Sequence, residues 1–395
     1  MLSRRVGLQH VELVEDAVQS ALLKSLESWT AVGAPADPSA WLYRVAYREV
    51  LGELRRQSGR RRHLRRLAVE TLGDDEVASQ LPQPDALGDD LLRMLFVCCD
   101  VSIPVESQLA FALKTLCGFS VSEIALRLFA SEANVYKRLG RARDRLRQLP
   151  RDFDAFDREQ CAERLPAVRQ VLYLIFTEGY LSSHAESAVR RELCDEAIRL
   201  AEILAEHPLG QAPESYALLA LMFLQAARFD SRQDAAGGLL LLEEQDRSRW
   251  DRGIICRGLW WLGKSAEGDC FSRFHAEAGI AAEHCLAPSF GETRWDRVAS
   301  CYELLERHAP SPMHTLNRAV AVAEWQGPHQ GLALLADLEP PTWLAASYLW
   351  SAVLADLHRR CGNDERYHHY RELALDTAPT APIRDLLRRR LTAAE

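Results

Sequence analysis

Apolar residues recur at intervals of three and four along almost the whole chain, which is the spacing of one face of an α-helix. No convincing run of alternating β-branched residues favours a strand. In the first segment the apolar positions are Val14, Val18, Leu22, Leu26 and Trp29. The opposing polar stripe is formed by Glu12, Glu15, Asp16 and Gln19. We therefore predict an all-α protein whose first segment is an amphipathic helix with an acidic face.

Turn-forming residues divide this helical pattern into parts. Asp37-Pro38 offers an N-cap acceptor and a first-turn proline to a second helix, which runs into the arginine-rich stretch RRQSGRRRHLRR. The chain from Leu72 to Asp90 is acidic and rich in Gly and Pro, which indicates a flexible linker. We expect two small helical domains, a linker and a long helical domain, with boundaries at 1–70, 71–90, 91–152 and 153–395.

The strongest local motif is SVSEIALRLFASEANVYKRLGRARDRLRQL. Ser120 and Glu123 form a capping box that opens a short helix, and a turn at Phe129-Ala130 leads into a second helix. The inner face of the second helix consists of Val135, Leu139, Ala142, Leu146 and Leu149. This pattern predicts a helix-turn-helix whose second helix lies in the major groove of DNA, although a solvated basic helix is the alternative. The residues expected to reach bases and phosphates are Glu132, Ala133, Asn134, Lys137, Arg138, Arg141, Arg143 and Arg145.

A second motif places aromatic rings beside arginines in the helix after Pro38. Its members are Trp41, Tyr43, Arg44, Tyr47 and Arg48. Rings beside guanidinium groups suit unpaired bases and their phosphates. We interpret Trp41 as a core residue, because Trp is highly buried on average, and Tyr47 and Arg48 as contacts to single-stranded DNA.

Composition narrows the function further. The first 150 residues carry a net charge of +2 and the remainder −10, so we expect the front of the chain to meet nucleic acid. The ten cysteines form no C-x-x-C pair, the histidines lack metal spacing, and no H-E-x-x-H, G-x-S-x-G or phosphate loop occurs. No apolar run is long enough for a membrane span or a signal peptide. We expect a cytoplasmic protein with no catalytic residue, metal or cofactor.

The order of these segments resembles a known family. VEDAVQSALLKSLESW, PSAWLYRVAYREVLGELRR, the acidic linker and the helix-turn-helix look like the two domains of extracytoplasmic-function sigma factors, over roughly the first two fifths of the chain. The resemblance implies that Glu12, Glu15, Asp16 and Gln19 dock on core RNA polymerase. It implies that the loop from Ala31 to Pro38 and the face around Tyr47 and Arg48 capture the melted minus-ten element of the promoter. It also implies that the face from Asn134 to Arg145 reads the minus-thirty-five element. These factors usually have another helix ahead of Glu15, so we expect the first domain to be short at its N-terminus.

The rest of the chain is similar to the tetratricopeptide-like extension of one branch of these sigma factors. The matching segments are VLYLIFTEGY, LCDEAIRL, YALLALM, LLLLEEQDRSRWDR and PSPMHTLNRAVAVAEWQGPHQGLALL. Such repeats form concave surfaces for peptides or proteins, so we expect a built-in regulator with a protein or peptide partner. The charged segment from Gln245 to Asp251 is either a partner-binding surface or a buried knot of ion pairs.

Two other functions fit part of the pattern. A conventional helix-turn-helix regulator with a sensory helical-repeat domain would bind duplex operators as a dimer, but it has no evident need for the acidic stripe or for Tyr47 and Arg48. A helical scaffold without DNA function would be indifferent to the loss of Arg138 and Arg141. We therefore favour the sigma factor.

Overall fold

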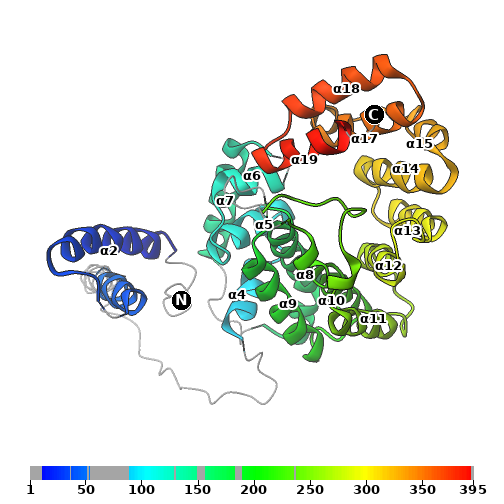
Figure 1. Ribbon diagram of the computed structural model, residues 1–395. Helices are drawn as coiled ribbons and strands as arrows, with labels where there is room; N and C mark the ends of the chain where they lie inside the picture. The colour runs from blue at the N-terminus through cyan, green and yellow to red at the C-terminus, as the bar shows by residue number, and fades with distance from the viewer. Residues whose placement is uncertain are drawn as a thin grey trace, which may run out of the picture. The chain divides into compact units, whose positions relative to one another are not determined.

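The computed structural model in Figure 1 describes residues 11–35, 37–50, 53, 89–128, 130–148, 156–182, 189–234 and 237–392. Within these ranges the chain contains helices and no strand, so the predicted all-α fold is confirmed; Gln233 and Leu239 form an isolated antiparallel bridge. The chain divides into two compact units, Met1–Phe119 with Tyr136–Arg164 and Ser120–Val135 with Leu165–Glu395. In the described part, no helix combines the length and the apolar composition needed to cross a membrane.

The first unit begins with a pair of helices, α2 (Val11–Val32) and a helix over 38–50. The predicted N-cap is confirmed, because the Asp37 carboxylate accepts a hydrogen bond from the Ala40 N–H at 2.9 Å. The two helices pack through a small buried core of Val14, Ala17, Ala21, Ala46 and Val50. Small side chains at this contact let the two helix axes approach closely.

The apolar face predicted for α2 is partly wrong. Val14 is buried, but Val18, Leu22 and Leu26 are 38%, 47% and 68% exposed. The buried positions are instead those of Ala17, Ala21 and Ser25. A second apolar stripe therefore remains on the surface of α2, beside its acidic residues.

The remainder of the first unit contains α4 (Asp90–Cys98), α5 (Val105–Thr115), most of α7 (Glu132–Leu146) and the first turns of α8 (Arg158–Tyr180). Asp100, which follows α4, forms an ion pair with Arg164 of α8, and both side chains are about 5% exposed. Burial raises the pKa of Asp100, but hydrogen bonds from Ser102 and the charge of Arg164 outweigh it and hold the pKa below its ordinary value. The pair therefore stabilises this unit at neutral pH and loses that effect as the pH falls through the lowered pKa.

The second unit contains α6 (Val121–Arg127), the rest of α8 and a series of helices that Figure 1 shows as a curved stack. These are α9 (Arg191–Glu206), α10 (Pro213–Ala226), the short 3-10 helices η3 (Phe229–Ser231) and η4 (Arg247–Arg249), α11 (Arg252–Ser265), α12 (Arg273–Leu286), α13 (Trp295–His308), α14 (Pro312–Gln326), α15 (Pro328–Leu335), α16 (Thr342–Ala345), α17 (Tyr348–Arg360), α18 (Asp364–Asp376) and α19 (Ala381–Thr392). Helices that are consecutive along α9 to α14 contact one another, as helical-repeat domains do.

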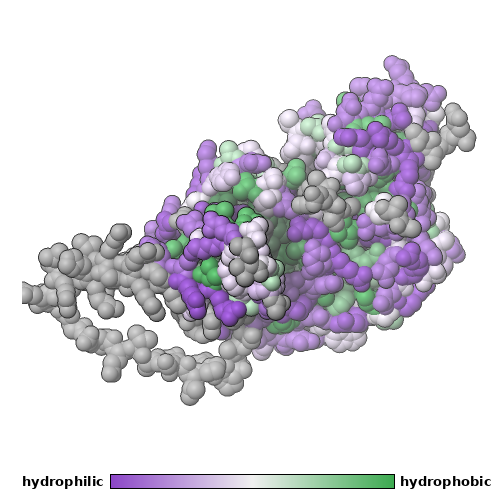
Figure 2. Space-filling model, turned by 60° about the vertical axis from the view of Figure 1, so that its left-hand side comes forward, coloured by the Kyte–Doolittle hydropathy of each residue, from purple (hydrophilic) through white to green (hydrophobic). Residues whose placement is uncertain are grey.

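The last helix of the second unit, α19, packs against the loop between η3 and η4. Leu239, from the loop between η3 and η4, packs in one core cluster with Ile383, Leu387 and Leu391 of α19. The Arg389 guanidinium donates to the carbonyl oxygen of Leu239. On the face drawn in Figure 2, hydrophilic residues cover much of the described surface and apolar residues show in separate patches.

At Gly179, α8 lies in direct contact with the start of α9. Its carbonyl oxygen accepts from the Arg190 N–H at 2.8 Å, and a Cβ at this position would lie 2.7 Å from the Arg190 carbonyl oxygen and from the Cys194 Sγ. Gly179→Ala is expected to lower the free energy of unfolding by about 2 kcal/mol, because backbone must shift. Gly263→Ala, in α11 with no neighbouring atom within 4 Å, is expected to raise it by up to about 1 kcal/mol. Urea unfolding measures both values, and equal stabilities of the two variants would contradict this packing.

The segment from Gln245 to Asp251 is partly buried. Trp250 is 3% exposed, and the Arg247 guanidinium lies 4.6 Å from its ring centroid. Arg247 donates to the carbonyl oxygens of His284 and Ala287 and, within the described residues, forms no ion pair. The interpretation of this segment as an ion-pair knot is therefore not supported, since main-chain carbonyl groups are the acceptors. Its role as a partner-binding surface stays a prediction.

His284, whose carbonyl oxygen accepts from Arg247, is expected to make the stability of the protein depend on pH. Burial, together with the charges of Arg228 and Arg247, lowers the pKa of His284 from 6.5 to about 3. Between these values the unfolded chain binds a proton that the folded chain does not, so acidification favours unfolding. From pH 7 to pH 5 this group is expected to contribute a loss of about 2 kcal/mol. Urea unfolding at both pH values should show a smaller loss for His284→Phe; an identical loss in both proteins would contradict the assignment.

Candidate nucleic-acid interface

Two helices joined by a short turn form the predicted helix-turn-helix, α6 and α7. The capping box is confirmed: the Ser120 Oγ accepts from the Glu123 N–H at 3.2 Å, and the Glu123 carboxylate accepts from the Ser120 N–H at 2.6 Å. In the turn, the Ala130 N–H donates to the carbonyl oxygen of Ala125 at 2.9 Å. Phe129 and Leu149 of the predicted motif lie outside the described residues. The cap and the turn of the predicted motif are therefore present in the described residues.

α7 has one buried face and one basic face. The buried residues are those predicted from the periodicity: Val135, Leu139, Ala142 and Leu146. The exposed candidates are Glu132, Ala133, Asn134, Lys137, Arg141 and Arg145, and the half-buried ones are Arg138 and Arg143. The helix carries five basic and two acidic residues, and this charge favours the phosphate backbone of DNA.

Two residues of α7 change the list drawn from the sequence. The Arg145 Nε donates to the Ser102 Oγ at 2.8 Å, so this guanidinium is partly engaged within its own unit. Tyr136 is 62% exposed and stands beside the basic residues, although it was not among the candidates. Helical periodicity could have predicted the exposure of Tyr136, because residue 136 falls outside the inner stripe at 135, 139 and 142.

α6 is held in the second unit by two pairs of charged side chains. The Arg127 guanidinium donates to the Glu178 carboxylate of α8, with the Nε at 3.0 Å, and to the carbonyl oxygen of Leu181 at 2.9 Å. Glu178 is completely buried. Arg190, directly before α9, donates to Glu123 at 2.8 Å, so the capping-box carboxylate serves both helices. The first helix of the motif is thus fixed to the elements that open the long helical domain.

The acidic face of α2 is accessible where the structure describes it. Asp16 and Gln19 are exposed and Glu15 is half-buried, while the side chain of Glu12 lies outside the described residues. The exposed stripe of Val18, Leu22 and Leu26 runs along the adjoining surface of the same helix. Acidic and aliphatic groups side by side form a surface suited to a protein partner with basic and apolar groups.

The aromatic residues of the helix over 38–50 are all half-buried, and Tyr43 and Tyr47 pack against the small core of this helix pair. Trp41 is half-buried, with its ring centroid 5.4 Å from that of Trp29. Tyr47 is half-buried and stacks on Tyr43 at 5.9 Å, whereas Arg48 is exposed. A stacked tyrosine with an exposed arginine beside it is compatible with an unpaired base and its phosphate. The arginine run after residue 54 and the acidic linker to residue 88 lie outside the described residues.

The described residues were also compared with the ligand sets that metal ions need. Among the residues that the structure describes, no group of three or more His, Cys, Asp or Glu side chains could hold a metal ion.

Comparisons with known proteins cover both units. Residues 2–60 match the family model "Sigma-70 region 2", and residues 102–146 match "Sigma-70, region 4". Residues 164–266 match "Family of unknown function (DUF6596)". The chain is 36% identical over 387 residues to "Uncharacterized protein R00370" of Rhizobium meliloti (strain 1021), a similarity that covers 95% of this chain and 89% of that protein. No solved structure matches the chain.

Proposed function

Because this chain belongs to the sigma-70 family, we propose that it is a sigma factor of the extracytoplasmic-function type, acting in the cytoplasm without enzymatic activity of its own. Sigma-70 regions 2 and 4 mark it as a sigma factor, and they imply interaction with core RNA polymerase and promoter DNA. The observation that carries the proposal is the helix-turn-helix within region 4, whose second helix is apolar inside and basic outside. The proposed domains are 1–70, 71–90, 91–152 and 153–395.

We assign polymerase binding to the acidic face of α2. Glu12, Glu15, Asp16 and Gln19 supply the polar contacts, and the exposed stripe of Val18, Leu22 and Leu26 supplies the apolar ones. Charge complementarity with a basic surface of core polymerase sets the orientation, while apolar burial adds affinity.

We assign promoter reading to two surfaces. Tyr47 and Arg48 bind unpaired bases of the melted minus-ten element, since their ring and guanidinium lie on one helix. The exposed face of α7 reads the minus-thirty-five element: its first residues, Glu132, Ala133 and Asn134, reach base edges, and its basic residues bind phosphates. The basic residues of α7 that bind phosphates are Lys137, Arg138, Arg141, Arg143 and Arg145.

We assign a regulatory role to the C-terminal helical domain, with a protein or peptide as its partner. Its support is the attachment of α6 through the ion pairs of Arg127 with Glu178 and of Arg190 with Glu123. Any rearrangement of α8 or α9 must break or carry these pairs, so it acts on the first helix of the DNA-reading motif.

Binding to purified core RNA polymerase tests the docking assignment. Asp16→Arg is expected to weaken binding of the labelled chain at least tenfold, because a like charge placed against a basic surface costs several kcal/mol. Glu339→Arg makes the same charge change on an exposed loop of the second unit and is expected to leave the affinity unchanged. Equal affinities of the two variants, or no binding by the parent chain, would refute the assignment.

A further inference from the structure

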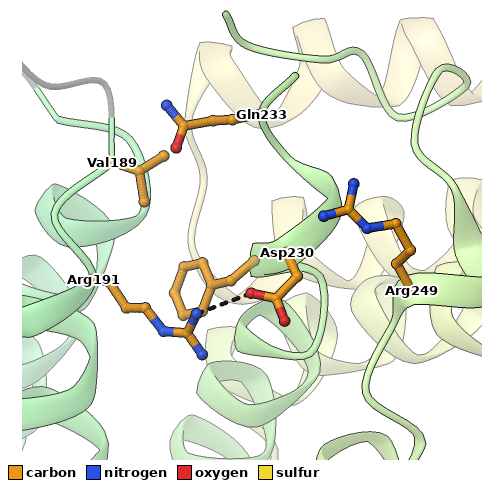
Figure 3. A pocket seen from close by; sticks show the side chains of 6 residues that line it. Val189, Arg191, Asp230, Gln233 and Arg249 are labelled. Carbon is orange, nitrogen blue, oxygen red and sulfur yellow. Dashed lines mark hydrogen bonds and ion pairs between the residues drawn. The ribbon is translucent and has the colours of Figure 1, made fainter. Parts of the chain in front are cut away.

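A pocket of about 460 Å³ lies in the second unit, between the start of α9 and the short helices η3 and η4 (Figure 3). Its lining consists of Val189, Arg191, Phe229, Asp230, Gln233 and Arg249. A volume of this size is that of small-molecule sites in proteins. The DNA-reading and polymerase-binding surfaces do not include these residues.

Hydrogen-bond donors come from two sides of the pocket. Arg249 extends into it from η4 (Figure 3), and its guanidinium bonds to no other residue in the described part of the chain. Arg191 donates to Asp230 at 2.9 Å through one Nη, which leaves other N–H groups of its guanidinium for a ligand. Arg191 is also the first residue of the 16-residue helix α9, whose N-terminal end favours negative charge.

Three more arginines lie close in sequence to the residues that line the pocket. Arg228 and Arg232 flank η3, and Arg247 begins η4. Their guanidinium groups donate to Tyr180, His284 and Ala287, and none of the three forms an ion pair with a described carboxylate. The Nε of Arg228 is buried without a hydrogen-bond partner among the described residues. Arginines without an ion-pair partner among the described carboxylates, close in sequence to the pocket residues, favour an anion in this region.

The pocket also contains hydrogen-bond acceptors, and Asp230 lies between the two arginines (Figure 3). Asp230 uses one carboxylate oxygen for Arg191, and the other remains for a ligand donor. The Gln233 Nε2 donates to the carbonyl oxygen of Gly237 at 2.9 Å, so the amide oxygen is the group left for a ligand. Phe229 and Val189 add an apolar wall. The Asp230 carboxylate would repel a bare inorganic anion. A ligand with both an anionic group and hydroxyl groups can bond to the arginine donors and to the acceptors of Asp230 and Gln233.

We propose that this pocket binds a phosphorylated sugar, either a free sugar phosphate or the ribose phosphate of a nucleotide. The phosphoryl oxygens accept from Arg249 and Arg191, whose planar guanidinium groups match phosphate geometry. The sugar hydroxyls donate to Asp230 and Gln233. The site adjoins Arg190, the residue that holds Glu123 of α6, so the ligand lies at the attachment of the DNA-reading motif. Binding itself does not depend on the proposed sigma function.

Calorimetric titration of the full chain tests the proposal with four probes: ribose 5-phosphate, AMP, ribose and inorganic phosphate. One of the first two is expected to bind saturably at one site, at least tenfold more tightly than ribose or inorganic phosphate. Tighter binding of AMP assigns a nucleotide, and tighter binding of ribose 5-phosphate assigns a free sugar phosphate. Equal affinity for inorganic phosphate, or no binding of either sugar phosphate, would overturn the proposal.

A matched pair of variants locates the site. Arg249→Gln is expected to weaken binding at least tenfold, because it removes a charged donor from the pocket. Arg252→Gln removes an equally exposed arginine three residues further along, outside the pocket lining, and is expected to bind as the parent does. Circular dichroism confirms that both variants are folded. Binding that Arg249→Gln leaves unchanged would place the ligand elsewhere and overturn the assignment.

Discussion

Arg127→Met is expected to lower the free energy of unfolding of the second unit by about 3 kcal/mol. The substitution removes the charged partner of Glu178, which is completely buried in α8, and it also removes the donor to the Leu181 carbonyl oxygen. A buried carboxylate that loses its cation keeps the cost of desolvation without the compensating attraction. Urea unfolding, followed by circular dichroism, measures the change.

A double-mutant cycle separates this pair from general damage. Adding Glu178→Gln to Arg127→Met is expected to recover part of the loss, because the buried group at 178 then carries no charge that Arg127 must offset. Arg199→Met breaks the exposed pair of Arg199 with Glu196 and is expected to cost less than about 1 kcal/mol. If Arg127→Met were no more harmful than Arg199→Met, α6 would not be anchored by this ion pair.

The double substitution Arg138→Ala with Arg141→Ala is expected to weaken promoter-DNA binding by about 10-fold to 100-fold at moderate salt. Each arginine that neutralises a phosphate releases counterions, so the slope of log affinity against log salt should fall by about 2. Fluorescence anisotropy with a fragment of the gene's own upstream region, measured across a salt series, gives both quantities.

A matched control removes the same charge from elsewhere. Arg294→Ala with Arg366→Ala takes two exposed arginines from the second unit and is expected to leave the salt slope unchanged. If the Arg138 and Arg141 variant also binds like the parent, α7 does not contact DNA through this face. A helical scaffold would then explain the chain better.

Local patterns were sufficient for the helix-turn-helix. The capping box of Ser120 and Glu123 and the N-cap of Asp37 involve atoms three residues apart, so the sequence contains everything that determines them. The buried stripe from Val135 to Leu146 follows from helical periodicity for the same reason. The matching family models agree with the family resemblance of these segments.

The packing between helices and the contacts between distant residues could not be predicted from the sequence. α2 carries two stripes that can pack, one of small residues at 14, 17 and 21 and one of larger residues at 18, 22 and 26. The partner helix decides which stripe is buried, and periodicity favoured the more hydrophobic one. The anchors of α6 join residues 51 and 67 positions apart, and no pattern in one sequence pairs Arg127 with Glu178 or Arg190 with Glu123. The pocket likewise could not be predicted, because its lining residues come from three separate segments of the chain, at 189–191, 229–233 and 249.

Run-off transcription with purified core RNA polymerase, this chain and the gene's own upstream region tests the central claim most directly. Salt is held constant, because promoter binding depends steeply on it. We expect a discrete transcript from the parent chain and from Glu339→Arg, and none from Asp16→Arg. Absence of any transcript from the parent chain, while it still binds the duplex, would contradict the sigma-factor assignment and favour a conventional DNA-binding regulator.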